Sequence, residues 1–326
     1  MRVAIFGAGG WGKNHVRTFC SILGEDAVVV CDPDPAQLQA ARAAHTGIET
    51  CDRPRFEGVD AVVIAAPAVL HYELAKDALN DGFHVLVEKP ITLTSDEAEE
   101  LARLAEERER ILMVDHLLEY HPAVVRLKEL VDEGRLGRIL HLTSRRLNLG
   151  VIRSEENALW SLAPHDVSVI LRLLDEEPIE VAAHGACFLQ DGIPDVVHAT
   201  LRFPSGALAH VHVSWQDPIK VRDLTVVGEE RMAVFDDVAE EKLTLFDARA
   251  RRADSGFVPH REGASVVDLA PGEPLRRVAE AFIDSVKTGR PPIADARDGL
   301  RVVRVLEAAQ RSMDAGGTVV RIGGSE

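Results

Sequence analysis

The first 32 residues constrain the fold more than any other part of this chain. A short apolar run at residues 2–6 leads directly into a GAGGWG turn at residues 7–12, and a stretch with helical spacing follows. Asp32 ends the next apolar run, twenty positions after Gly12. A G-x-G-x-x-G turn that ends a strand, opens a helix and is followed by an acid at this distance is typical of a dinucleotide-binding βαβ unit. The sequence therefore predicts a parallel α/β sheet that begins at the N-terminus.

Each glycine of the turn has a physical reason. Gly7 permits the tight turn, Gly9 lets the backbone approach a pyrophosphate at the helix N-terminus, and Gly12 lets the helix pack closely on the sheet. Asp32 can accept hydrogen bonds from the adenosine ribose and would repel a 2′-phosphate, which favours NAD over NADP. Further cofactor contacts are expected from the rest of the turn and from a loop after a later strand, at Gly10, Trp11, Pro67 and His71.

Two alternatives to this interpretation stay open. In the first the turn is a glycine turn without a ligand, and in the second His71 is a satisfied loop histidine, which fits the sequence as well as a cofactor contact does. Arg53 and Arg55 lie further along the chain, where they would be the side chains to reach the 2′-phosphate of NADP.

Strand and helix signals alternate through the first 120 residues, with continuous apolar strands. This pattern predicts a doubly wound parallel sheet covered on both faces, a Rossmann domain over residues 1–120. Later the pattern changes to long strands with short turns between 179 and 246, closed by two helices. Residues 121–326 are therefore expected to form an α+β domain with an open, mainly antiparallel sheet. The charged, irregular segment 249–263 is expected to be a loop.

Composition excludes several classes of function. Lys+Arg is 37 and Asp+Glu is 53, a net charge of −16, which argues against binding to nucleic acids or anionic membranes. No apolar run approaches the roughly 20 residues of a membrane span, and the N-terminus does not resemble a signal peptide. We therefore expect a soluble, cytoplasmic protein whose four cysteines are free thiols.

Lys89 is the most suggestive candidate for chemistry. It lies in Val-Glu-Lys-Pro at residues 87–90, directly after the apolar strand candidate 83–87. This position directs its amine toward the sheet edge at which open α/β sheets bind ligands. Because desolvation lowers the pKa of a lysine readily, Lys89 is a candidate for proton transfer. Taken without the glycine turn, it would be an ordinary solvated lysine.

Together the glycine turn, Asp32, the VEKP segment and the sheet-rich second half resemble the Gfo/Idh/MocA oxidoreductase family. In that family the lysine lies between the nicotinamide and the substrate hydroxyl, and its peptide bond to proline is often cis, which aims the neighbouring side chain. The resemblance implies that Lys89 is catalytic and that Glu88 and Pro90 position it next to the cofactor.

The family also has a D-x-G-x-H signature at the start of a helix. Here residues 161–165 read SLAPH, so His165 matches the histidine and Ser161 stands where aspartate is usual. The segment 148–169 resembles a subgroup of sugar nucleotide enzymes, including the dehydrogenase that oxidises C3 of UDP-N-acetylglucosaminuronate. Other side chains of this segment are candidates for binding the substrate beside Lys89, Ser161 and His165: Arg153, Asn157 and Trp160.

Oxidation of a secondary alcohol requires a hydride acceptor, which NAD supplies, and a base for the hydroxyl proton. We assign His165 as the proton acceptor and Lys89 as the group that orients and polarises the hydroxyl, and the reverse assignment stays open. Three functions remain in competition: a sugar nucleotide dehydrogenase, a dehydrogenase or NADPH ketoreductase acting on free sugars or inositol, and a cofactor-binding sensor. The pair Lys89 and His165 disfavours the sensor.

His210 and His212 alternate along a strand candidate and should share one face of the sheet. No acid or cysteine accompanies them at a ligand spacing, so we expect no metal site. A sheet face that its own helices leave uncovered needs a partner, which predicts a homodimer or homotetramer. The other expected partner is a small sugar or sugar nucleotide.

Overall fold

A computed structural model describes residues 1–54, 57–254 and 256–323. The chain divides into two compact units, Met1–Tyr120 with Gly272–Val303, and His121–Pro271 with Arg304–Glu326. The first division thus falls at residue 120, but the predicted second domain is not one continuous segment. Residues 272–303 belong to the first unit, because the apolar face of one of their helices completes its core.

In the described part of the first unit, six parallel strands pair in the order β3-β2-β1-β4-β5-β6. Every residue of β1, β2 and β4 is buried, so both faces of this sheet are covered. The strands are β1 Val3–Phe6, β2 Val28–Cys31, β3 Glu49–Cys51, β4 Ala61–Ile64, β5 His84–Val87 and β6 Leu112–Val114.

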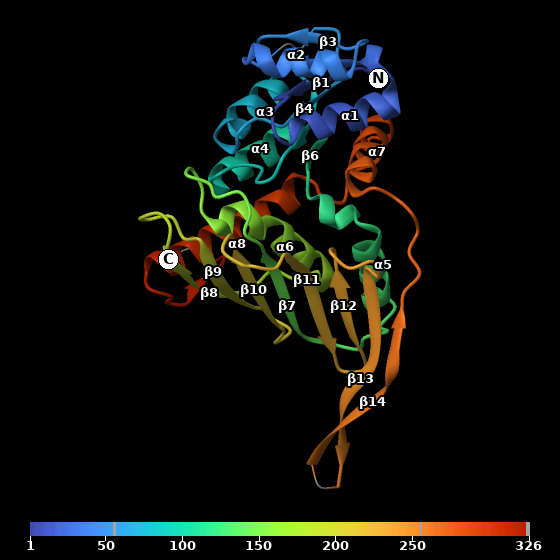
Figure 1. Cartoon of the computed structure of the whole chain (residues 1–326), viewed down its shortest axis with the longest axis vertical. Coiled ribbons are helices and arrows are strands. Elements are labelled where there is room, and N and C mark those ends of the chain that lie inside the picture. Colours follow the sequence, from blue (N-terminus) through green and yellow to red (C-terminus); the bar gives the residue numbers. More distant parts are fainter. Residues whose placement is uncertain (55–56, 255, 324–326) are drawn as a thin grey trace. The chain divides into compact units, whose positions relative to one another are not determined.

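The helices of this unit alternate with most of its strands, as the sequence predicted. Helix α1 packs with α7, and α3 packs with α4 (Figure 1). Val278, Ala279 and Phe282 of α7 are fully buried in the same core as β1 and α1. The helices are α1 Gly12–Leu23, α2 Pro35–Ala44, α3 His71–Asn80, α4 Ser95–Glu107, α7 Pro274–Thr288 and α8 Ala296–Asp314. The chain passes from the first unit to the second within α8. Short 3-10 turns lie at Glu25–Ala27, Ala68–Leu70 and Leu117–Tyr120.

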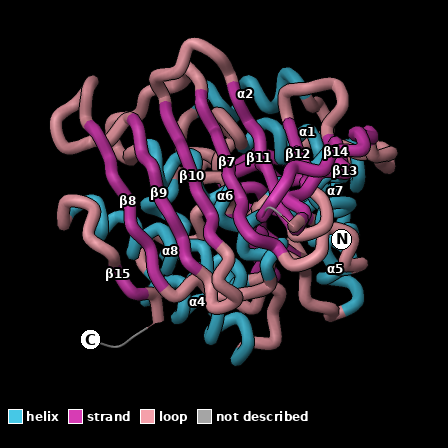
Figure 2. The backbone as a smooth tube through the Cα atoms, turned by 90° about the horizontal axis from the view of Figure 1, so that it is seen from below, coloured by secondary structure: helices cyan, strands magenta, loops and turns pink. Residues whose placement is uncertain are grey.

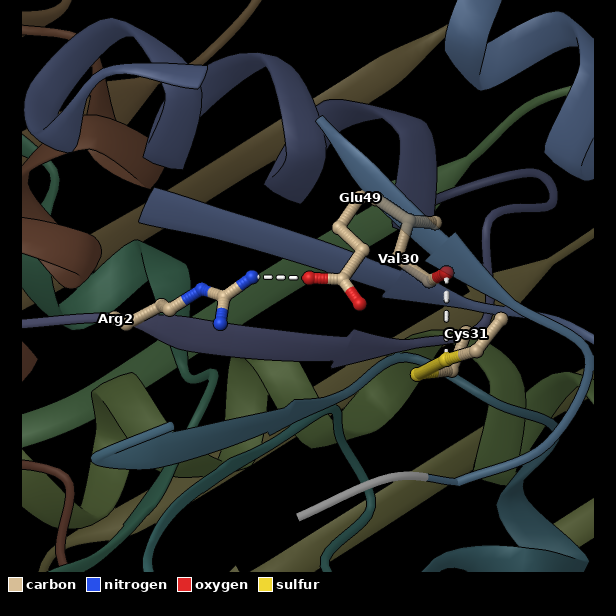
Figure 3. The surroundings of a disulfide bond; sticks show 5 residues. Arg2, Val30, Cys31 and Glu49 are labelled. Carbon is tan, nitrogen blue, oxygen red and sulfur yellow. Dashed lines mark hydrogen bonds and ion pairs between the residues drawn. A yellow bond between two sulfur atoms is a disulfide. The ribbon is translucent and has the colours of Figure 1, made fainter. Parts of the chain in front are cut away.

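The expectation of four free thiols is wrong for two of them. Cys31 and Cys51 form a disulfide, whereas Cys20 and Cys187 are free (Figure 3). The two bonded residues end β2 and β3, neighbouring parallel strands that pair them directly, with their Cα atoms 4.7 Å apart. The sequence did not reveal this proximity, because β3 is only three residues long and was not predicted.

In the described part of the second unit, a sheet of mixed direction pairs β7 with β10 in parallel and its other neighbouring strands antiparallel. Its order in the described residues is β14-β13-β12-β11-β7-β10-β9-β8-β15. The mainly antiparallel sheet expected from the sequence is therefore present. Its elements are α5 Pro122–Asp132, β7 Ile139–Leu147, α6 Ala158–Leu174, β8 Glu180–Ala186, β9 Val196–Arg202, β10 Leu208–Ser214, β11 Val221–Gly228, β12 Met232–Asp236, β13 Leu243–Ala253, β14 Gly256–Val266 and β15 Val320–Arg321.

One face of this sheet packs against α6, which contacts β7, β9 and β10. Figure 2 looks onto the other face, where the strands are not covered by helices. Residues along β9 and β10 alternate between buried and more exposed, as expected for a sheet with one solvated face. None of the described helices is long and apolar enough to cross a membrane.

Two local predictions in this unit were wrong. Segment 249–263 is not a loop, because β13 and β14 pair along most of their length as a hairpin. Its residues lack an apolar alternation since most of them are exposed, and the strands are recognisable by their backbone pairing. The SLAPH residues do not start a helix: α6 begins earlier, at Ala158, because Asn157 caps it by accepting a hydrogen bond from the Trp160 N–H (3.2 Å).

Candidate active site

The glycine turn has the shape that a dinucleotide requires. Gly7 has φ +96°, and a Cβ there would lie 2.6 Å from the Ala65 carbonyl oxygen. A Cβ on Gly12 would lie 2.0 Å from the carbonyl oxygen of Gly7, so the start of α1 can approach the strand only as glycine. A Cβ on Gly9 would meet no atom within 4 Å, which leaves open space where the pyrophosphate is expected. The turn therefore fits a dinucleotide.

Asp32 follows β2 and also holds the turn in place. One carboxylate oxygen accepts a hydrogen bond from the Ala8 N–H (2.7 Å), and the other accepts one from the Asp34 N–H (2.8 Å). The side chain is largely buried beside the turn. Position and chemistry are those expected of the acid that would contact an adenosine ribose.

The remaining predicted cofactor residues differ in their surroundings. Gly10, Trp11 and Pro67 are exposed. His71 is buried, with Nδ1 2.7 Å from the Pro90 carbonyl oxygen and Nε2 2.9 Å from that of Ala66. Burial, assisted by the charge of Lys89, lowers the pKa of His71, so a neutral ring donates to one of the two carbonyls. The ring therefore lies between the carbonyl groups of two loops at the sheet edge and bonds to one of them.

Of the two arginines considered for a 2′-phosphate, Arg53 is exposed and Arg55 lies outside the described residues.

Lys89 lies at the carboxyl edge of the parallel sheet, two residues after β5 ends. The Lys89–Pro90 peptide bond is cis, as the resemblance implied. The lysine side chain is half-buried, and its charge influences three groups around it, His71, Glu88 and His116. The structure thus brings Lys89, Glu88 and Pro90 to the same sheet edge as the glycine turn.

A buried cluster that the sequence reasoning missed lies next to Lys89. His15 of α1 is completely buried, with Nε2 2.9 Å from Glu88 Oε1 and 3.3 Å from Asp115 Oδ2. Although burial opposes the charge, hydrogen bonds to the two carboxylates raise the pKa of His15 to about 9. Burial and the charge of Asp115 raise the pKa of Glu88. The sequence held one signal for this cluster: His15 lies on the same helix face as Gly12.

In the second unit, the residues of the SLAPH segment lie within α6. Ser161 and His165 are one helical turn apart and so share a face, with Ser161 buried and His165 partly exposed. His165 is therefore in the middle of the helix, and not at its start as predicted.

The other substrate candidates of this unit are engaged locally. Arg153 is exposed and pairs with Glu156 (3.1 Å). Asn157 caps α6 and donates a hydrogen bond to Gln310 (2.8 Å). Trp160 is partly buried in the first turn of α6.

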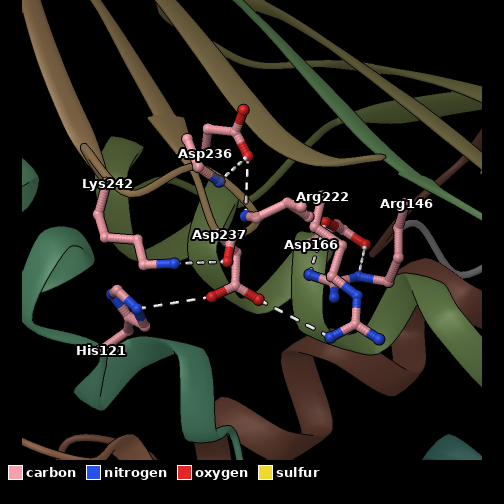
Figure 4. Close-up of polar contacts among 9 residues, drawn as sticks. His121, Arg146, Asp166, Arg222, Asp236, Asp237 and Lys242 are labelled. Carbon is pink, nitrogen blue, oxygen red and sulfur yellow. Dashed lines mark hydrogen bonds and ion pairs between the residues drawn. The ribbon is translucent and has the colours of Figure 1, made fainter. Parts of the chain in front are cut away.

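A second missed cluster anchors α6 to the sheet directly beside His165. The Asp166 carboxylate accepts hydrogen bonds from Ser144 Oγ (2.6 Å) and from Nε and Nη2 of Arg146 (2.8 and 3.2 Å). Both charged side chains are buried, and Arg222 and Asp237 lie nearby (Figure 4). Asp166 is therefore held by two side chains of β7.

The uncovered face of the large sheet carries several histidines. His210 and His212 share this face as predicted, with His210 Nδ1 3.0 Å from Thr200 Oγ1 and the His212 ring stacked on His198 at 3.9 Å. Among the described residues, the one group of three side chains with metal-ligand geometry is the buried cluster of His15, Glu88 and Asp115.

Comparison with known families matches both halves of the chain. Residues 1–116 match the oxidoreductase family model with the NAD-binding Rossmann fold, and residues 124–234 match the GFO/IDH/MocA C-terminal domain.

Three relatives extend over nearly the whole chain. The UDP-N-acetylglucosamine 3-dehydrogenase of Acidithiobacillus ferrooxidans is 28% identical over 97% of this chain and 98% of its own. Its solved structure superposes with a TM-score of 0.82 at 26% identity and covers 97% of this chain and 98% of that one. A putative oxidoreductase from Magnetospirillum magnetotacticum is 33% identical, with a TM-score of 0.81 over 94% of this chain and 99% of that one. The scyllo-inositol 2-dehydrogenase (NAD(+)) of Bacillus subtilis is 25% identical over 97% of this chain and 95% of its own. With its dinucleotide turn, its Glu-Lys-Pro strand end and both family domains, the chain belongs to the Gfo/Idh/MocA family of NAD-binding sugar oxidoreductases.

Proposed function

We propose that this protein is an NAD-dependent dehydrogenase that oxidises a secondary hydroxyl of a sugar nucleotide, with C3 of a UDP-N-acetylhexosamine as the first candidate. The observation that supports the chemistry is the position of Lys89, two residues after β5, at the same carboxyl edge of the parallel sheet as the glycine turn. The full-length similarity to a UDP-N-acetylglucosamine 3-dehydrogenase supports the substrate class.

The proposed reaction assigns separate tasks to the residues of the chain. The turn at residues 7–12 and Asp32 hold the dinucleotide, whose nicotinamide supplies the hydride acceptor when bound. Lys89 donates a hydrogen bond to the substrate hydroxyl oxygen and orients it. His165 accepts the hydroxyl proton, since an imidazole ordinarily titrates near neutrality. Ser161, where the family usually has aspartate, supplies at most a hydrogen bond.

The preference for NAD rests on Asp32. Its carboxylate lies at the end of β2 with both oxygens fixed by backbone N–H groups, so it cannot turn away from a ribose 2′-phosphate without breaking them. A buried negative charge in that position disfavours NADP.

A second candidate function is oxidation of a free inositol. The similarity to the scyllo-inositol 2-dehydrogenase over nearly the whole chain favours it. The candidates differ in what the substrate must offer: a diphosphate and a nucleoside in the first case, and only hydroxyl groups in the second.

The test is NAD reduction by the purified protein, followed through the absorbance of reduced nicotinamide. UDP-N-acetylglucosamine, UDP-N-acetylglucosaminuronate, myo- and scyllo-inositol and free hexoses are compared at equal concentration. We expect turnover with one of the UDP-sugars. A preference for UDP-N-acetylglucosaminuronate would show that the enzyme recognises the carboxylate of its substrate. Turnover confined to inositols would select the second candidate, and no turnover in either direction would refute the enzymatic proposal.

Lys89→Ala tests the assignment of the lysine in the same assay. Turnover should disappear while NADH still binds, because the turn and Asp32 are unchanged. Near-normal turnover would remove Lys89 from the mechanism.

We also propose that the protein is a homodimer or homotetramer that covers the open face of the large sheet. The face carries His198, His210 and His212 in contact with one another or with Thr200. Light scattering coupled to size-exclusion chromatography measures the mass, and a monomer at micromolar concentration would contradict the proposal.

A further inference from the structure

Two carboxylates lie side by side at the edge of the sheet that carries Lys89. Val87 of β5 and Val114 of β6 are direct partners in the parallel sheet, so the next residue of each strand, Glu88 and Asp115, occupies an equivalent position. Asp115 is fixed there by its own backbone N–H, which donates to the Val87 carbonyl oxygen (2.7 Å). Both side chains are buried or nearly so. Two buried like charges at this spacing repel each other and destabilise the edge unless a cation accompanies them.

His15 supplies the compensating group, from a different element. Its Nε2 is within 3.3 Å of an oxygen of each carboxylate, and the ring is completely buried. Its Nδ1 has no hydrogen-bond partner among the described residues, so all of its polar contacts are directed to the two acids. The pair of carboxylates outweighs the cost of burying the charge, and the pKa of His15 lies at about 9.

The contact continues from Glu88 into the backbone of Lys89. While Oε1 of Glu88 faces His15, its Oε2 accepts a hydrogen bond from the Lys89 N–H (3.2 Å). The same Glu88 residue is anchored by its backbone N–H to Ile64 of β4 (2.9 Å). A glutamate that is held at both oxygens fixes the peptide that leads into the cis Lys89–Pro90 bond.

We propose that His15, clamped between Glu88 and Asp115, is a positioning residue that fixes the Lys89 backbone and thereby the placement of its amine at the reacting hydroxyl. The proposal rests on the proposed dehydrogenase function, which makes Lys89 a catalytic residue. It also links two parts of the site, because His15 lies one helical turn after Gly12, which closes the dinucleotide turn.

The charged and titratable groups around this cluster come from several elements. Lys89 follows β5, and its charge acts on Glu88, His71 and His116. His116 follows β6, where the carboxylates of Asp115 and Asp298 also act on its ring. The test must therefore separate His15 from these neighbours, which requires a direct observation of its ring as well as kinetics.

The kinetic test is a double-mutant cycle in the full-length protein, with the UDP-sugar that gives turnover. His15→Gln keeps a donor toward Glu88 but cannot compensate two charges, so kcat should fall roughly 10–100-fold, as for a displaced catalytic group. KM and the dissociation constant for NADH should change little. Adding Asp115→Asn should restore much of kcat, since only Glu88 then needs a donor. An unchanged kcat in His15→Gln, or strictly additive losses in the double variant, would overturn the proposal.

The direct test does not depend on turnover or on the folding of His15→Gln. Nitrogen NMR of histidine side chains in the wild-type protein reports the protonation of each ring. The charge of Asp115 also acts on His116, so the signal that moves in both Asp115→Asn and Glu88→Gln identifies His15. We expect a doubly protonated ring at pH 7.5. A neutral ring at that pH, or a stoichiometric metal ion in the purified protein, would overturn the proposal whatever the substrate is. No turnover with any substrate, combined with a protonated His15, would instead locate the failure in the proposed function.

Discussion

The buried pair of Arg146 and Asp166 predicts a large and specific loss of stability in Asp166→Ala. Asp166 accepts three hydrogen bonds, two from Arg146 and one from Ser144, and the side chains of the ion pair are only 7% and 5% exposed. Removal of the carboxylate leaves the Arg146 guanidinium buried without its partner (Figure 4). Breaking a buried pair in this way costs about 3–5 kcal/mol.

The expected effect is large enough to measure by calorimetry. In a unit of 150–250 residues each kcal/mol lowers Tm by about 2–4 °C, so the transition that contains the second unit should move down by roughly 6–20 °C. The thermal scan is paired with far-UV circular dichroism, which should show an unchanged fold at low temperature.

A matched control removes a carboxylate from an exposed pair in the same unit. Arg138 contacts Glu229 through Nε and Nη2 at 3.1 and 2.7 Å, but the two side chains are 58% and 46% exposed. Glu229→Ala should therefore cost no more than about 1 kcal/mol. If Asp166→Ala lowered Tm no more than Glu229→Ala, the argument from burial would be refuted.

Three further predictions concern the first unit. Gly12→Ala should abolish NADH binding, because its Cβ would lie 2.0 Å from the Gly7 carbonyl oxygen, whereas Gly10→Ala, with no atom within 4 Å, should bind NADH in a fluorescence titration. Asp32→Ala should raise the ratio of kcat/KM for NADP relative to NAD while weakening NAD binding, since the Ala8 N–H loses its acceptor; an unchanged ratio would contradict the role of Asp32. The pKa of His15 is raised from 6.5 to about 9 on folding, so its stabilising contribution is complete below pH 6.5 and is lost as the pH rises through 9. Urea unfolding should therefore show an advantage of wild type over His15→Gln that shrinks between pH 7 and pH 10, and a constant advantage would argue against a charged His15.

The parallel sheet could be predicted because its signals are local. Buried strands such as Ala61–Ile64 are continuous apolar runs, and glycines or capping residues mark the ends of the elements between them. The strand Glu49–Cys51 could not be predicted, because it is very short and none of its residues is buried. The hairpin at 249–263 was not predicted for a related reason, because the residues of an exposed hairpin show no alternation of apolar and polar side chains.

The candidate site divides in the same way. The glycine turn, Asp32 and Lys89 are visible in the sequence because each begins within two residues of the end of an apolar strand. His15 and Asp115 are not, because their significance arises only when β5 and β6 align and α1 lies against them. Asp166 shows the limit of local reasoning, since its partner Arg146 comes from another element, twenty residues earlier.

The return of residues 272–303 to the first unit bears on how the protein is made. The N-terminal segment contains the whole nucleotide turn, yet Phe282 and its neighbours on α7 complete the core on which α1 lies. A nascent chain of only the first 120 residues therefore leaves part of the apolar core of the first unit exposed. That surface stays exposed until nearly the entire chain has emerged from the ribosome. The usual order, in which an N-terminal domain folds before the next one is translated, cannot run to completion here. Expression of residues 1–120 alone should accordingly give an aggregation-prone fragment, and chaperone contact during translation should persist until α7 leaves the exit tunnel.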